Sequence, residues 1–90
     1  MSTVLITGAS RGIGKETAKA FADAGWDLLL LARSEDDLKN LIKEINNKKV
    51  KVFYQSIDLS KPKDISKGIA ELTKNGLVPE VLINNAGVAW

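Results

Sequence analysis

The chain lacks cysteine and histidine altogether, and only two of its 90 residues are proline. Without cysteine it forms no disulfide, and without either residue it cannot build the usual zinc sites. Its longest apolar run, 28–32, is far too short to cross a membrane. The first predicted strand begins near residue 3, which leaves no room for a signal peptide. Together with the lack of cysteine, this predicts a cytoplasmic protein.

Neither sign of charge dominates, since 13 basic and 11 acidic side chains give a net charge of +2. The lysines are scattered along the chain, which is typical of solvated faces, and we expect no nucleic-acid or membrane partner. Aromatic residues are also few, at 6%. The length and the 44% hydrophobic content indicate one small globular domain with a thin core.

Short apolar segments alternate with amphipathic ones. The pattern predicts strands at 3–7, 27–32, 50–56 and 80–84, with a helix in each interval. The four leucines at 28–31 are apolar on both faces of a strand, which indicates a parallel sheet covered on both sides. Right-handed crossovers then give an α/β, Rossmann-like doubly wound sheet with strand order 3-2-1-4.

The helices carry recognisable ends. Gly25 is the expected stop of the first helix, Ser34 the cap of the second and Pro62 the start of the third. The periodicity of the first helix, expected over 13–24, predicts one buried stripe. Its members are Ile13, Thr17, Ala20, Phe21 and Ala24.

Three glycines follow the first strand at the spacing Gly-x-x-x-Gly-x-Gly, and a helix follows them. A dinucleotide site needs this order, because glycines allow the backbone to approach a pyrophosphate and a helix start offers unpaired N–H groups. We therefore assign Gly8, Gly12 and Gly14 to a bound dinucleotide. Gly14 has a second interpretation, in which it only lets the helix pack closely on the sheet.

With these elements in place, three motifs of the chain resemble those of the short-chain dehydrogenase/reductase family, in order and at family spacing. They are Thr-Gly-Ala-Ser-Arg-Gly-Ile-Gly at 7–14, Asp58-Leu59 after the third strand, and Asn-Asn-Ala-Gly at 84–87. The resemblance covers essentially the whole chain, and the loop spacing is similar to that of the family's compact branch. It implies an oxidoreductase that transfers hydride between a nicotinamide and a carbonyl or alcohol substrate, usually as a homo-oligomer.

The family's catalytic serine and Tyr-x-x-x-Lys pair have no counterpart here. The only tyrosine, Tyr54, lies in the predicted third strand, and Asp58 stands four residues later. We name no catalytic residue and no metal ligand. Residues 1–90 are expected to form an incomplete, inactive NADP-binding domain from the N-terminal part of a longer enzyme. The alternatives are a non-catalytic nucleotide-binding module and an inactive fragment.

Cofactor choice is predicted from the end of the second strand, where Arg33 and Ser34 stand in place of an acid. The guanidinium fork of Arg33 suits a 2′-phosphate, and similar NADP-dependent family members carry a basic residue at the place of Arg11. These residues predict NADP(H) over NAD(H). Glu35 is the counter-argument, because a shift of the strand boundary by two residues would bring it near the ribose.

The resemblance implies further contacts. Ser10 and Ile13 would line the glycine loop, and Asp58 would accept a hydrogen bond from the adenine amino group with Leu59 beside it. Asp58 has an alternative role, which is to satisfy its own loop backbone. Asn84 has a structural interpretation instead, in which its side-chain amide ties neighbouring strands together. The predicted cofactor contacts are Gly8, Ser10, Arg11, Gly12, Ile13, Gly14, Arg33, Ser34, Asp58, Leu59, Asn85, Ala86 and Gly87.

Overall fold

The computed structural model describes residues 2–85, and strands alternate with helices along this range. The strands are β1 (Thr3–Thr7), β2 (Asp27–Ala32), β3 (Val52–Ser56) and β4 (Val81–Asn84); the helices are α1 (Gly12–Asp23), α2 (Glu35–Glu44) and α3 (Pro62–Thr73). Every strand pair is parallel, and the order is β3-β2-β1-β4. The predicted fold class and strand order are confirmed, although β3 and β4 begin slightly later than expected.

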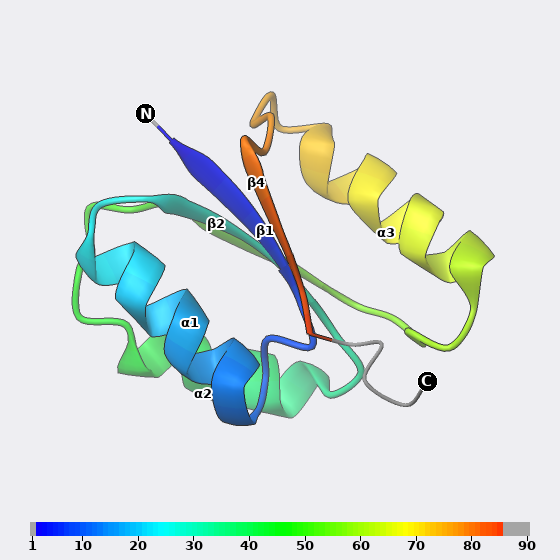
Figure 1. Ribbon diagram of the computed structural model, residues 1–90, viewed down its shortest axis with the longest axis horizontal. Helices are drawn as coiled ribbons and strands as arrows, with labels where there is room; N and C mark the ends of the chain where they lie inside the picture. The colour runs from blue at the N-terminus through cyan, green and yellow to red at the C-terminus, as the bar shows by residue number, and fades with distance from the viewer. Residues whose placement is uncertain (1, 86–90) are drawn as a thin grey trace.

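The sheet is covered on both faces, as the run of leucines predicts. Helices α1 and α2 lie on one face and α3 lies on the other (Figure 1). Side chains alternate between these layers along each strand, since Leu28 and Leu30 face α1 and α2 whereas Leu29 and Leu31 face α3. All residues of β1 and β2 are buried, so the two central strands form the middle of both cores.

The predicted helix ends are confirmed. The Ser34 hydroxyl accepts a hydrogen bond of 3.1 Å from the Asp37 N–H, which caps α2. Pro62 is the first residue of α3, where a missing N–H does no harm. Gly25 follows the end of α1 with a φ of 91°, a left-handed conformation that favours glycine. These ends fix where each helix meets the sheet.

The predicted buried stripe of α1 is wrong. Gly14, Ala18 and Ala22 face the sheet and are buried, whereas Ile13, Ala20 and Ala24 are exposed. Of the predicted stripe, Thr17 and Phe21 are half-buried at its margin. The reason is close packing: the smallest side chains let α1 approach the sheet, so size and not hydrophobicity sets the face.

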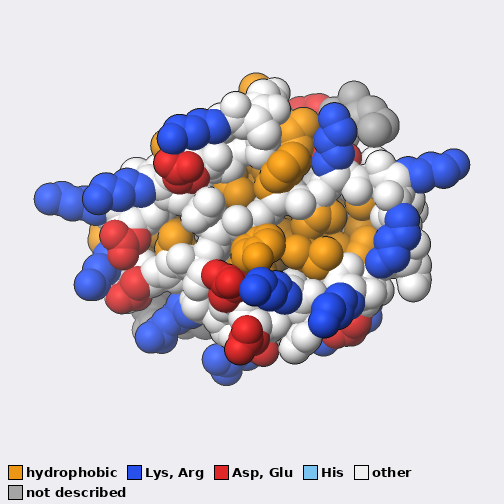
Figure 2. Space-filling model, turned by 180° about the vertical axis from the view of Figure 1, so that it is seen from behind, with side chains coloured by type: hydrophobic (Ala, Val, Ile, Leu, Met, Phe, Trp, Pro, Cys, Tyr) orange, Lys and Arg blue, Asp and Glu red, His pale blue; other side chains and the backbone are white. Residues whose placement is uncertain are grey.

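The edge strands are less covered than the central ones. Residues of β3 and β4 are half-buried or exposed, and the Leu82 side chain is 62% exposed. Seen from behind, hydrophobic side chains remain visible between basic and acidic ones (Figure 2). Within residues 2–85 no helix is both long enough and apolar enough to span a bilayer.

The corrected face of α1 can be tested with a matched pair of substitutions. Ala18→Leu places a large side chain between α1 and the sheet, where Ala18 has no exposed surface. We expect it to lower the free energy of unfolding by about 1–3 kcal/mol in urea denaturation. Ala20→Leu, on the exposed side of the same helix, should change it by less than about 0.5 kcal/mol. Equal losses from the two variants would contradict the observed face.

Candidate functional site

The chain turns sharply after β1, at the carboxyl edge of the sheet. Gly8 and Gly12 adopt φ values of 65° and 53°, which side-chain-bearing residues rarely adopt. The turn is fixed to the end of β2, because the Gly8 N–H donates to the Leu31 carbonyl oxygen at 2.8 Å. Two of the predicted glycines therefore have a backbone reason to be glycine, whatever they bind.

Gly14 has a different constraint, which is space. A Cβ on Gly14 would collide with the Gly8 carbonyl oxygen, and it would lie 3.1 Å from the side-chain amide nitrogen (Nδ2) of Asn85. The start of α1 thus rests directly on the backbone of the turn. This confirms the interpretation in which Gly14 lets the helix pack closely, and its contact with a ligand stays a prediction.

The ends of β1 and β4 are tied together by side chains. The Thr7 hydroxyl donates to the Asn84 side-chain oxygen at 2.8 Å and accepts from the Asn85 N–H at 3.2 Å. Thr7 and Asn84 are partners in the parallel register. The structural role of Asn84 is confirmed. Sequence reasoning missed Thr7, although its place directly before the first glycine was a usable signal.

An open hollow of about 290 Å³ lies beside the turn. It is lined by Gly8, Arg11, Ile13, Gly14 and Asn85, all of which are predicted site residues. Ile13 is 78% exposed, so it serves this surface and not the core. The side-chain amide nitrogen of Asn85 is buried and has no hydrogen-bond partner among residues 2–85.

Such an orphaned donor is costly, by about 1–3 kcal/mol. An acceptor atom of a ligand in the hollow would satisfy it. This buried donor thus fits a phosphate or hydroxyl oxygen of a dinucleotide.

The end of β2 carries Arg33 and Ser34 at the same edge. The Arg33 carbonyl accepts a 2.7 Å hydrogen bond from the Ser56 hydroxyl, which ties this corner to β3. Arg33 is exposed to solvent. Ser34 uses its oxygen as the α2 cap, and its hydroxyl proton is left to donate. Ser10 lies half-buried in the turn between β1 and α1.

Asp58 lies in the loop after β3. Its carboxylate accepts hydrogen bonds from the Ser60 hydroxyl at 2.6 Å and the Ser60 N–H at 3.0 Å. These bonds are the main reason that the pKa of Asp58 lies below its ordinary value, and the nearby charges of Lys61 and Arg33 lower it further against the opposing effect of desolvation. The loop-backbone role is confirmed.

An ionised carboxylate retains acceptor capacity on its second oxygen, so the adenine contact predicted for Asp58 stays open. The neighbouring Leu59 is half-buried and packs against the α3-side core. The two remaining predicted contacts, Ala86 and Gly87, lie outside the described residues. Among residues 2–85 no group of His, Cys, Asp or Glu side chains could hold a metal ion.

Comparison with known proteins matches this architecture to one family. The family described as short chain dehydrogenase matches residues 2–90. The chain belongs to the short-chain dehydrogenase family. Its members are oxidoreductases, and the chain shares 41% identity over 86 residues with sulfoacetaldehyde reductase 2 of Chromohalobacter salexigens. That alignment covers 96% of this chain and 34% of the relative.

Two further short-chain dehydrogenase relatives bear on the site. NADP-dependent 3-hydroxy acid dehydrogenase of Schizosaccharomyces pombe is 44% identical over 89 residues, which cover 97% of this chain and 34% of the relative. L-sorbose reductase of Gluconobacter frateurii, in complex with NADPH and L-sorbose, superposes with a TM-score of 0.85 at 30% identity, over 96% of this chain and 33% of that one. The chain thus spans about a third of the length of these relatives.

Two buried helical glycines provide a test of the Gly14 contact. Alanine favours a helix over glycine by about 0.5–1 kcal/mol, so helix propensity alone would make Gly14→Ala stabilising. We expect the opposite, a loss of about 1–3 kcal/mol in the free energy of unfolding, because the new Cβ meets backbone that cannot move aside.

Gly68→Ala in α3 is the control, since the three atoms nearest to its Cβ would be side-chain atoms of Leu31 and Ile57, at 3.1–3.4 Å. Gly68→Ala should lower the free energy of unfolding clearly less than Gly14→Ala does. If urea denaturation showed Gly14→Ala to be as stable as the parent, the helix start would not rest on the turn as described.

Proposed function

We propose that this chain is the NADP(H)-binding part of an oxidoreductase that transfers hydride between a nicotinamide and a carbonyl or alcohol substrate. The observation that carries the proposal is the hollow beside the glycine turn, into which the orphaned amide of Asn85 can donate. Because the chain spans about a third of its relatives, the activity and the substrate class concern the whole protein.

The proposed binding mode follows from the groups around the hollow. The pyrophosphate would lie over the glycine turn, close to the first N–H groups of α1 and to the Asn85 amide. Ile13 would supply an apolar wall. The nicotinamide, when bound, supplies or accepts the hydride; the residues described here only hold and orient the cofactor.

The preference for NADP(H) rests on the two arginines at the carboxyl edge. Arg11 and Arg33 can each place a forked cation beside a 2′-phosphate. The relative from Schizosaccharomyces pombe is named as NADP-dependent, and the sorbose reductase was solved with NADPH, which supports this choice. Glu35 is the first residue of α2 and forms a 3.1 Å ion pair with Lys39, which favours its role as a first-turn helix acid.

We propose further that Asp58, Leu59, Ala86 and Gly87 surround the adenosine, and that catalytic groups come from outside these 90 residues. One observation favours a second candidate, a nucleotide-binding module without catalysis. The only tyrosine among these 90 residues, Tyr54, is half-buried in β3 and packs against the core, and the residue four positions later is Asp58 and not a lysine. Oxidation of NADPH by the intact protein with carbonyl substrates would separate the two candidates.

Cofactor choice is tested by calorimetric titration of the intact protein with NADPH and NADH. We expect NADPH to bind more tightly. Arg33→Gln should weaken NADPH binding by about tenfold or more, since a charge-assisted hydrogen bond is lost, and should leave NADH binding nearly unchanged. Lys48→Gln is the control: it also removes one positive charge, but from the loop before β3, near the amino ends of the strands. It should change neither the NADPH affinity nor the NADH affinity. Equal affinities for the two cofactors, or tighter binding of NADH, would refute the preference.

A further inference from the structure

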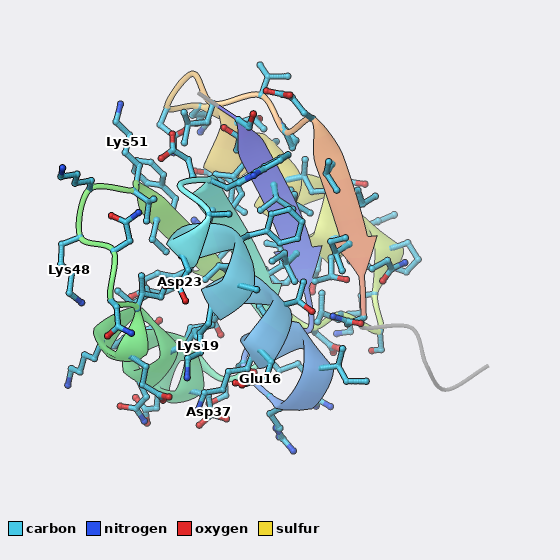
Figure 3. The ribbon with its side chains drawn as sticks, turned by 60° about the vertical axis from the view of Figure 1, so that its left-hand side comes forward. Glu16, Lys19, Asp23, Asp37, Lys48 and Lys51 are labelled. Carbon is cyan, nitrogen blue, oxygen red and sulfur yellow. The ribbon has the colours of Figure 1, made fainter. Side chains whose placement is uncertain are left out.

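Basic residues of α1 meet acidic residues of α2 along the seam between the two helices. Lys15 and Lys19 both reach Glu44, at 2.8 Å and 3.4 Å. At the other end of the seam, Arg11 approaches Asp37, with 4.0 Å between Nε and a carboxylate oxygen. Figure 3 shows Glu16 and Lys19 of α1 above Asp37 of α2. Lys15 and Lys19 lie four positions apart on one side of α1, and Arg11 precedes them at the N-cap of the helix.

The Arg11 end of this seam differs from the Glu44 end. Each lysine side chain is 32% exposed and held by a close carboxylate, whereas the Arg11 side chain is 84% exposed and its ion pair is the longest. Arg11 also lines the hollow. Because the Arg11 side chain is mostly exposed and its contact with Asp37 is long, its guanidinium can turn toward a second anion, which the proposed function identifies as the 2′-phosphate.

Asp37 is firmly placed for this role. It is the third residue of α2, and its N–H is held by the Ser34 cap, which fixes the backbone beneath the carboxylate. The carboxylate is 43% exposed and also acts on Lys15. Its first-turn neighbours differ: Glu35 pairs with Lys39, and no ion pair joins Asp36 to Arg11 within residues 2–85.

We propose that Asp37 is a specificity-determining residue, which competes with the cofactor's 2′-phosphate for Arg11 and thereby limits the preference for the phosphorylated dinucleotide. The inference rests on the proposed function. A dinucleotide without the 2′-phosphate has no group that must displace Asp37, so the carboxylate acts on one cofactor and not on the other. Asp37 therefore reduces the preference for NADP(H) over NAD(H) that Arg11 and Arg33 create.

The test compares adenosine 2′,5′-bisphosphate with 5′-AMP, by calorimetry on the intact protein. Asp37→Asn keeps the side-chain shape and the helix cap but removes the charge. We expect it to raise the affinity for the bisphosphate about two- to fivefold at low salt, as the loss of one exposed charge interaction allows, with affinity for 5′-AMP unchanged. The gain should shrink as salt is added. No gain, or a loss, overturns the proposal, and a loss would mean that Asp37 positions Arg11 for the phosphate.

Two further variants make the result specific. Asp36→Asn removes one negative charge from the same helical turn, but Asp36 forms no ion pair with Arg11 within residues 2–85. It should raise the affinity for the bisphosphate clearly less than Asp37→Asn does. In an Arg11→Gln background, Asp37→Asn should lose most of its effect, and a full gain there would overturn the competition for Arg11. If the parent protein binds neither compound, the proposed function fails; if it binds both and Asp37→Asn changes nothing, only this inference fails.

Discussion

The contact between Gly14 and the Gly8 carbonyl is the constraint on which the rest of the site depends. Because no side chain fits between them, the start of α1 lies directly over the ends of the central strands. That position brings Arg11, Ile13 and Asn85 around one hollow. The small residues at Ala18 and Ala22 continue the same close approach along the helix, so core packing and site geometry have a single origin.

The carboxyl edge of the sheet is held by polar side chains as much as by the strands. Thr7 joins β1 to the end of β4, and Ser56 joins β3 to the corner that carries Arg33. The chain is therefore anchored where it leaves the strands toward the candidate binding groups. Such anchoring lets charged residues stand in solvent while their backbone stays in place, which a site for an anionic ligand requires.

Sequence reasoning reached those features that depend on local chemistry. The alternation of segments and the run from Leu28 to Leu31 were enough for the strand order, and Ser34 and Pro62 marked helix starts through their own hydrogen-bonding limits. The face of α1 was missed because periodicity counts apolar side chains and does not register how closely a helix must approach. The pairing of Lys15 with Glu44 depends on how two helices lie relative to each other, which no local pattern contains.

The unequal cover of the strands has a consequence for how the molecule opens. Both central strands are buried throughout, whereas the outer strands are only partly covered. Fluctuations that expose backbone amides to solvent should therefore begin at the edges, and the amides of β1 and β2 should be the last to exchange with deuterium. The glycine turn is rooted in those two strands, so it belongs to the slowest-opening unit of the domain, and the loop after β3 that carries Asp58 belongs to a faster one.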